Sequence, residues 1–208
     1  MNYLELINLI IGIVVAYLIG SIPTSYIFGR VLKGIDLRQY GSGNLGATNV
    51  YRVVGKLPGT AVLLIDLSKG LFAVTVISWI FSLNIEYQRL LLGLSAVCGH
   101  NWTVYLKFKG GKGVATTLGV LLGLKPILVL LAVGVWGVTL LSTRFVSLGS
   151  IMAAIAIPVI VAIYGKWGLG YVLFTSILCL IIVFRHHSNI RRLIKGEEKK
   201  LWGKKKEV

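Results

Sequence analysis

Apolar residues follow one another in long runs along most of this chain, and short polar stretches rich in glycine, small polar residues and basic residues separate the runs. Runs that are apolar on all sides, rather than along one stripe, are typical of helices that lie in lipid. They predict an all-α polytopic membrane protein, a single bundle that takes up residues 1–208 as one domain. The expected segments are residues 3–28, 57–83, 90–106, 113–123, 126–142, 145–164 and 168–184.

The segment at 113–123 is the shortest. At ~1.5 Å per residue it falls short of the ~30 Å of hydrocarbon in a bilayer, so it is either a short helix or half of a re-entrant pair. Lys125 and Pro126 predict a turn after it, because joining it to the next segment would send the basic C-terminal tail to the wrong side. The count is therefore seven crossings, or five crossings and a re-entrant hairpin.

Composition and charge support this interpretation, since 56% of residues are hydrophobic and only 14% are charged. Most of the 22 lysines and arginines fall in alternate loops, which predicts an N-terminus outside the cell and a cytoplasmic C-terminus. No basic motif is interleaved with aromatic residues, so nucleic acid is not expected as a partner. The lysines of the tail are expected to attract anionic membrane lipid: Lys199, Lys200, Lys204, Lys205 and Lys206.

Several kinds of site are not indicated. Cys98 and Cys179 lie inside apolar runs without a CxxC pattern, so neither a disulfide nor a metal site is expected, and nothing in the sequence requires a cofactor. No G-x-S-x-G or H-E-x-x-H pattern occurs, and no histidine is followed five positions later by aspartate. The first 20 residues lack a basic region and a cleavage site, so they are expected to be a retained span.

Three polar segments, at 41–52, 107–117 and 186–192, are expected to face the same compartment. In the first, glycines let the backbone approach an oxyanion, and Arg52 offers a planar fork for phosphate. The alternative is a connecting loop whose Ser, Asn and Thr residues cap helices.

The second segment contains Gly110, Gly111, Lys112 and Gly113 at an expected helix start. Bare backbone N–H groups beside lysine ammoniums favour an anion there, and phosphate is the usual one. The turn is not a Walker loop, because glycine follows Lys112 where that motif needs Ser or Thr. The alternative is a turn at the membrane border with snorkelling lysines.

In the third segment, Asn189 follows His186 by three positions, so a continuing helix would place both on one face. An imidazole with a pKa near ~6.5 can orient a hydroxyl or take its proton, although a border histidine can also be merely polar. Arg144, Ser147 and Ser150 are expected on the same side. The two serines could instead cap a helix or bond to its preceding turn.

Asp66 and Lys69 lie within a predicted span, where charges are costly unless they are paired or face a polar cavity. A structural pair is favoured over a catalytic one. His100 and Asn101, near the inner end of the third segment, either line the same cavity or bond to neighbouring helices.

These segments resemble the motifs of the PlsY family of bacterial acyl-phosphate:glycerol-3-phosphate acyltransferases, and the similarity covers most of the chain. The resemblance implies acyl transfer from acyl phosphate to the 1-hydroxyl of sn-glycerol 3-phosphate, at the cytoplasmic side of the bacterial inner membrane. The products would be lysophosphatidic acid and inorganic phosphate. No metal, cofactor or obligate protein partner is implied.

The resemblance and the residue chemistry together define the candidate site. The expected catalytic residues are Ser42, His186 and Asn189. The expected phosphate-binding residues are Thr48, Asn49, Arg52, Gly110, Gly111, Lys112, Gly113, Arg144 and Ser150. Supporting roles are expected for Asp66, Lys69, His100, Asn101 and Glu198. The chain departs from the family at His187, where arginine is common, and the base is either His186 or a phosphate oxygen of the substrate.

A function of another class is a transporter or flippase for an organic phosphate, because spans interrupted by glycine and proline with buried charges also mark substrate pathways. Two observations disfavour it: the halves show no internal repeat, and the charged motifs gather on one face. A membrane scaffold without catalysis is a weaker alternative.

Overall fold

The computed structural model describes residues 2–202, and within that range every regular element is helical, as the sequence predicted. The chain divides into two compact units at Pro126. The single domain expected from the sequence stays a prediction. The tail residues Lys204, Lys205 and Lys206 lie outside the described residues.

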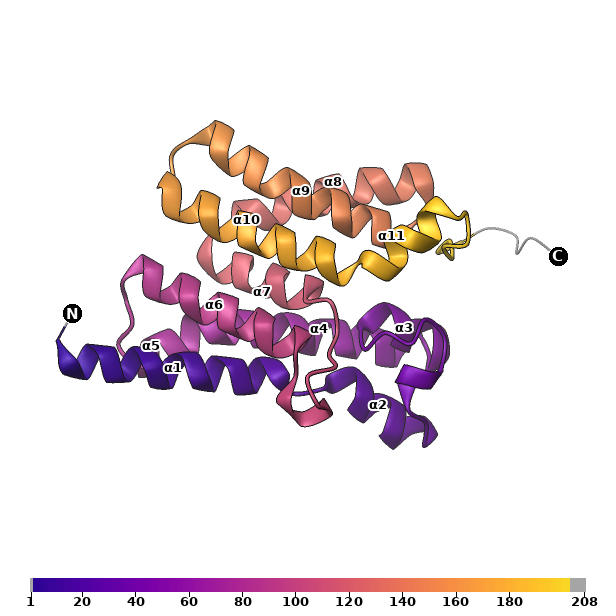
Figure 1. Ribbon diagram of the computed structural model, residues 1–208, viewed down its shortest axis with the longest axis horizontal. Coiled ribbons are helices and arrows are strands. Elements are labelled where there is room, and N and C mark those ends of the chain that lie inside the picture. The colour runs from indigo at the N-terminus through magenta and orange to yellow at the C-terminus, as the bar shows by residue number, and fades with distance from the viewer. Residues whose placement is uncertain (1, 203–208) are drawn as a thin grey trace. The chain divides into compact units, whose positions relative to one another are not determined.

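The first unit pairs α1 with α6 and α4 with α7, and these helices run side by side in Figure 1. Its elements are α1 (Tyr3–Ser21), α2 (Thr24–Lys33), the 3₁₀ turn η1 (Leu37–Gln39), α3 (Ala47–Val53), α4 (Lys56–Phe72), the π-helical turn η2 (Ala73–Ile77), α5 (Ser78–Ile80), α6 (Glu86–Asn101), the 3₁₀ turn η3 (Val104–Leu106) and α7 (Val114–Leu124).

Helix α1 has a defined start and a sharp end. Asn2 and Glu5 form a reciprocal capping box, in which the Asn2 side chain accepts a 2.8 Å bond from the Glu5 N–H. The helix ends at Ser21 because Pro23 disfavours helical backbone at the preceding Ile22, which has ψ 116°. The prediction of one uninterrupted segment at 3–28 was therefore wrong at this break, where α2 begins.

Glycines allow α1 and α6 to approach closely. A Cβ at Gly20 would collide with the Ala96 carbonyl oxygen, and one at Gly99 would collide with the carbonyl oxygen of Tyr17. The contact is completed by the Ser21 hydroxyl, which donates to the Gly99 carbonyl over 3.2 Å. Small residues are the usual means of close packing between helices in lipid, where hydrophobicity alone does not drive association.

Glycines also allow α4 and α7 to approach closely. A Cβ at Gly70 would collide with the Thr116 carbonyl oxygen, and one at Gly119 with that of Leu67. At the other end of this pair, the Arg89 guanidinium donates to backbone carbonyls of η2 and α7, including a 2.8 Å bond to Gly123. These contacts fix where α7 begins, and its start carries the glycine-rich turn.

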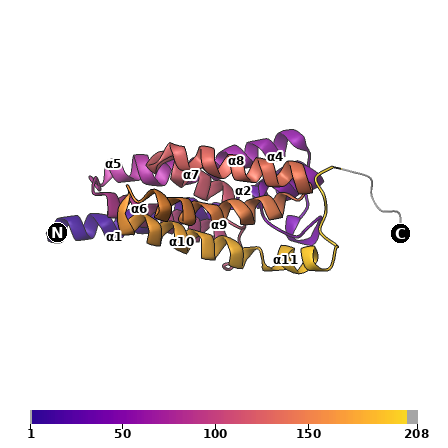
Figure 2. The same cartoon turned by 90° about the horizontal axis from the view of Figure 1, so that it is seen from above.

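The second unit contains α8 (Pro126–Thr143), α9 (Val146–Tyr164), α10 (Gly168–Arg185) and α11 (His187–Ile194). Helices α9 and α10 are packed neighbours, as Figure 2 also shows. Helix α7 ends at Leu124 and α8 begins at Pro126, so the predicted turn at Lys125 and Pro126 is confirmed.

Five helical stretches of the described chain are long and apolar enough to cross a membrane, which agrees with a multi-pass protein: Tyr3–Lys33, Lys56–Ile80, Pro126–Thr143, Val146–Tyr164 and Gly168–Arg185. Helix α6 has 16 residues and ends at Asn101, so the predicted extension of its segment to 106 was wrong. Helix α7 has 11 residues, as short as expected. The number of membrane-crossing helices, about seven, stays a prediction.

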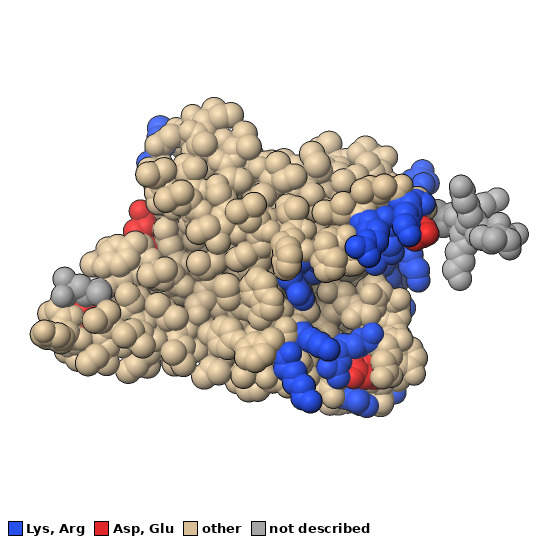
Figure 3. Space-filling model, viewed as in Figure 1, with Lys and Arg blue, Asp and Glu red and all other residues tan. Residues whose placement is uncertain are grey.

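Basic side chains gather at one end of each unit. In Figure 3 those of the first unit lie over the end that carries α2 and α3, and those of the second unit lie around α11. Within the first unit, Arg30, Lys33, Arg38 and Arg52 are all exposed. This clustering agrees with the alternate-loop pattern of the sequence.

Candidate active site

The loop that carries Ser42 is held by the buried side chain of Asn49, which is 2% exposed. The Asn49 carbonyl oxygen accepts a 2.9 Å bond from the Ser42 N–H. Its amide nitrogen donates to the carbonyls of Tyr40 at 3.0 Å and Leu37 at 3.4 Å. Both hydrogens of the side-chain amide are thus donated to backbone carbonyls, because a buried amide needs hydrogen-bond partners. These contacts give Asn49 a loop-forming role, and the phosphate contact expected of it stays a prediction.

Ser42, Thr48 and Arg52 keep positions suited to a ligand. Ser42 and Arg52 are exposed, and Thr48 is half-buried in the first turn of α3. Gly41 has φ +66°, and a Cβ there would collide with the Asn49 side chain. The loop can therefore pass directly over Asn49 only with glycine at position 41.

An ion pair fixes the chain between α2 and this loop. The Asp36 carboxylate accepts bonds from Arg38, including one of 2.6 Å from Nη2, and Arg30 stands 3.9 Å away. The Arg38 hydrogen bonds lower the pKa of Asp36 to about 2, although burial opposes the shift. Both guanidinium groups also lie over the Tyr26 ring. These two arginines are therefore engaged in fixing the loop.

The glycine-rich turn is hydrogen-bonded to the backbone at the end of α6. The N–H of Gly110 donates to the Asn101 carbonyl at 3.2 Å, and the N–H of Gly111 donates to the His100 carbonyl at 3.0 Å. The prediction that bare N–H groups of this turn await an anion is wrong for these two positions. Glycine is instead required because the turn packs closely against the end of α6, where a Cβ at Gly110 would collide with the His100 carbonyl.

Unused polar atoms surround the start of α7. Gly113 precedes the helix with φ +77°, and none of the described side chains caps it. The Asn101 side chain lies against Gly113, is 0% exposed, and has no hydrogen-bond partner for either amide atom within the described residues. The buried hydroxyls of Thr116 and Thr117 also lack partners in that part of the chain. Lys112, half-buried, immediately precedes Gly113. A helix start with free hydrogen-bonding groups suits an anion or ordered water.

Asp66 and Lys69 form the ion pair that the sequence predicted, with Nζ and Oδ1 2.6 Å apart and both side chains at most 4% exposed. Lys69 also donates to the Ile22 carbonyl at 2.6 Å and to the Thr24 hydroxyl. The His100 Nδ1 lies 3.8 Å from the same Asp66 oxygen. The pair therefore connects α4 with the α1–α2 break and with the end of α6.

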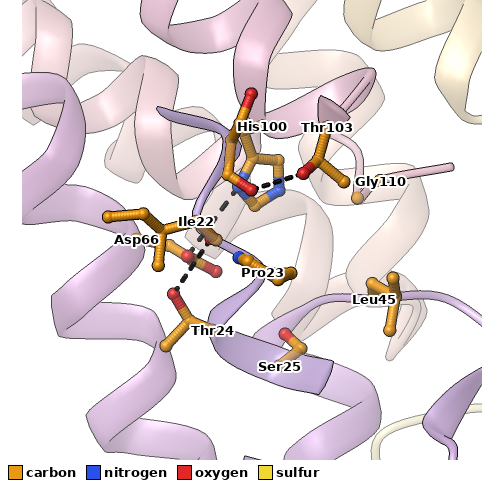
Figure 4. A pocket seen from close by; sticks show the side chains of 11 residues that line it. Ile22, Pro23, Thr24, Ser25, Leu45, Asp66, His100, Thr103 and Gly110 are labelled. Atoms are coloured by element: carbon orange, nitrogen blue, oxygen red, sulfur yellow. Dashed lines mark hydrogen bonds and ion pairs between the residues drawn. The ribbon is translucent and has the colours of Figure 1, made fainter. Parts of the chain in front are cut away.

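Asp66, His100 and Thr24 line a small pocket shown in Figure 4, whose space is about that of a single water molecule. The Ser25 hydroxyl lines it and has no partner among the described residues. Thr103 also lines it and donates to the Ser21 carbonyl. Ser21, Thr24, Ser25 and Thr103 were not predicted as site residues. The clustering of polar side chains around Pro23 was the available signal.

In the second unit, His186 lies at the junction of α10 and α11 and is 3% exposed. Its Nδ1 lies 2.8 Å from the Ile182 carbonyl oxygen. A carbonyl only accepts, so Nδ1 carries a hydrogen, and Nε2 is the ring nitrogen that is left to accept a proton. Helix α10 ends at Arg185 and α11 begins at His187, with His186 between them, so the one continuing helix that would place His186 and Asn189 on one face is not formed.

The Glu198 carboxylate gathers three donors. Asn189 Nδ2 donates to Oε1 at 2.6 Å, Ser147 Oγ to Oε1 at 2.7 Å, and Arg192 Nε to Oε2 at 2.6 Å. Burial alone would raise the pKa of Glu198, but these hydrogen bonds outweigh it and lower the pKa below its ordinary value. The Ser147 link was missed because its partner lies 51 residues away.

The other predicted residues of this unit have backbone contacts. Arg144 is exposed with φ +67°, and its carbonyl accepts a 2.8 Å bond from the Leu201 N–H. Ser150 is 7% exposed and donates to the Val146 carbonyl at 3.0 Å, the back-bonding alternative considered from the sequence. Within residues 2–202, no group of three His, Cys, Asp or Glu stands close enough to hold a metal ion.

The sequence model of one protein family, described as glycerol-3-phosphate acyltransferase, matches residues 10–196. A glycerol-3-phosphate acyltransferase of Chlorobaculum parvum is 45% identical over 91% of this chain and 94% of its own length. One of Desulforamulus reducens is 43% identical over 99% and 100%. The crystal structure of PlsY (YgiH), an integral membrane glycerol 3-phosphate acyltransferase, in its glycerol 3-phosphate form, is similar with a TM-score of 0.86 at 36% identity over 93% of this chain and 96% of that one.

Proposed function

Because the chain belongs to the glycerol-3-phosphate acyltransferase family, we propose that it transfers a fatty acyl group from acyl phosphate to the 1-hydroxyl of sn-glycerol 3-phosphate. The products are lysophosphatidic acid and inorganic phosphate, and the step begins phospholipid synthesis. The observation that carries the proposal is the start of α7, where Lys112 precedes Gly113, and where the buried Asn101 amide and the buried hydroxyls of two threonines have no hydrogen-bond partner among the described residues.

Phosphate is the ligand that suits this place. A helix start attracts negative charge, and the Lys112 ammonium adds a cation beside it. Arg52, exposed on α3 of the same unit, adds a guanidinium whose donors match phosphate in pairs. We assign glycerol 3-phosphate to the Lys112 turn, and assign Ser42 and Arg52 to the orientation and phosphate contact of the acyl phosphate.

The reaction needs little covalent help from the protein. The 1-hydroxyl oxygen attacks the acyl carbonyl carbon, the bond from that carbon to the phosphate oxygen breaks, and the hydroxyl proton leaves with a base. An acyl phosphate is already activated, so orientation of the alcohol and offset of crowded negative charge lower the barrier most.

His186 and Asn189 serve the attacking hydroxyl in this proposal. Because Nδ1 of His186 donates to the Ile182 carbonyl, Nε2 is the ring nitrogen that can take a proton. The ring either takes the proton or orients the hydroxyl while a substrate phosphate oxygen takes it. A pH–rate profile of His186→Ala separates the two. Near-wild-type turnover with an unchanged profile eliminates the histidine base.

The membrane side is part of the proposal. The protein lies in the bacterial cytoplasmic membrane with an outer N-terminus, a cytoplasmic C-terminus and a site on the cytoplasmic side, because basic residues gather in alternate loops. Lys200→Cys in a variant without Cys98 and Cys179 tests this. An impermeant maleimide should label it only in opened cells, and labelling of intact cells contradicts the assignment.

The choice of donor is tested with purified protein in detergent. Acyl phosphate and an acyl thioester are each supplied with glycerol 3-phosphate, and inorganic phosphate and lysophosphatidic acid are measured. Product from acyl phosphate alone supports the proposal, whereas product from the thioester alone overturns the assigned donor. Uptake of glycerol 3-phosphate into vesicles without acylation would favour the transporter instead.

A further inference from the structure

We infer that Asp66, Lys69 and His100 are positioning residues, which hold the glycine-rich turn at 110–113 so that Lys112 is presented for glycerol 3-phosphate. The inference rests on the proposed role of Lys112. None of the three is assigned a contact with substrate, so each acts through the backbone that it fixes.

The chain of contacts begins at Lys69. Its ammonium has three hydrogens, and its three acceptors are Asp66 Oδ1, the Ile22 carbonyl and the Thr24 hydroxyl. Ile22 belongs to the break between α1 and α2, and its carbonyl accepts from the Thr24 N–H at 3.0 Å as well as from Lys69. One buried cation thus locks α4 to the α1–α2 break.

The next link passes from Asp66 to the turn. Asp66 Oδ1 lies 3.8 Å from His100 Nδ1, and the His100 side chain is only 9% exposed. The opposite side of the ring, at Nε2, occupies the place that a Cβ on Gly111 would need. The imidazole is therefore confined between a carboxylate and the backbone of Gly111, whose N–H also bonds to the His100 carbonyl. Lys112 is the next residue along the chain.

The buried charges of this cluster indicate a function beyond packing. Apolar residues of similar volume often replace a buried ion pair without loss of stability, and charges in lipid are costly. The buried charges hold the imidazole in place, and the imidazole holds the turn. This positioning offsets the energetic cost of burying charge, because a displacement of a binding group by about 1 Å can cost about a hundredfold in rate.

Three variants test the inference. His100→Phe keeps a ring against Gly111 but loses the nitrogen that faces Asp66. The double variant Asp66→Leu/Lys69→Met removes both charges together, so that neither is left buried alone. Ser95→Ala is the matched control, because it removes a 2.7 Å bond from α6 to the Ile13 carbonyl, away from the turn.

We expect His100→Phe and the double variant to raise the KM for glycerol 3-phosphate about tenfold or more, with the KM for acyl phosphate within about twofold of wild type. Ser95→Ala should lower the melting temperature and leave both KM values unchanged. A purely structural cluster would reduce the folded fraction and the apparent kcat without this selective change in KM, and that result overturns the inference. If the double variant fails to fold, His100→Phe alone decides.

A double-mutant cycle separates this inference from the proposal beneath it. His100→Phe and Lys112→Met are combined, and kcat/KM for glycerol 3-phosphate is measured with radiolabelled substrate. If Lys112→Met alone leaves the KM for glycerol 3-phosphate unchanged, the assigned role of Lys112 is wrong. If it raises the KM and His100→Phe then adds little further loss, the inference stands. Independent, multiplying effects overturn it.

Discussion

Asn189 donates a 2.6 Å hydrogen bond to the Glu198 carboxylate, nine positions further along the chain. The same oxygen accepts from Ser147, and the other oxygen accepts from Arg192. The carboxylate therefore determines which way the Asn189 amide faces, and through Ser147 it joins α11 to the start of α9. A residue expected to act in the reaction is thus oriented by one expected only to support it.

Replacement of Glu198 by glutamine should reduce kcat by about tenfold or more, because a neutral amide can no longer accept from all three donors and weakens the charge-assisted bonds. The measurement is steady-state acylation by purified protein. Glu197→Gln is the matched control, since Glu197 is exposed and, within residues 2–202, the hydrogen bond recorded for it is that of its backbone N–H with the Arg192 carbonyl. Equal activity of both variants would contradict the orienting role.

Acid should weaken the loop next to Ser42. The pKa of Asp36 is lowered from 3.8 to about 2, so its ion pair stabilises the fold fully above pH 4 and loses that contribution as the pH falls through 2. Arg38 is 38% exposed, so we expect Asp36→Asn to cost only about 1 kcal/mol at neutral pH. Thermal unfolding against pH should show wild type and variant converging in acid. A constant difference down to pH 2 would contradict the shift.

The close contact of α1 and α6 should not tolerate a methyl group. Gly99→Ala places a Cβ against the Tyr17 carbonyl, and we expect a loss of about 1–3 kcal/mol in stability, seen as a lower melting temperature in detergent. Gly134→Ala on α8 is the control, because a Cβ there meets no atom of the described chain within 4 Å. Similar melting temperatures for the two variants would argue against backbone contact between α1 and α6.

Asn101 offers a test that separates stability from binding. Asn101→Leu replaces a fully buried amide without hydrogen-bond partners, within the described residues, by an apolar side chain of similar volume. We expect an unchanged or higher melting temperature, because leucine at this position removes the unpaired polar atoms of the buried amide. The KM for glycerol 3-phosphate should rise severalfold if the amide contributes to the site. A lower melting temperature with normal KM would assign Asn101 a structural role.

Much of the site was predictable because its residue types are chemically distinctive. Asp66 and Lys69 lie three positions apart in an apolar run, and the cost of isolated charge in lipid requires such residues to pair, as they do. The glycine-rich turn was also located correctly. The hydrogen bonding of its N–H groups was not predicted, because the carbonyls of His100 and Asn101 that accept from them belong to the end of α6.

The amino-acid order by itself determined which stretches are helical and apolar, where the Pro126 turn falls, and which polar segments separate the apolar ones, because those properties depend on a residue and its near neighbours. Only the tertiary structure decided that Asn49 shapes the Ser42 loop, that His100 stands between Asp66 and Gly111, and that Ser147 reaches Glu198. Each of these depends on how closely two helices or loops approach, and that distance is set by side chains and glycines far apart in the chain.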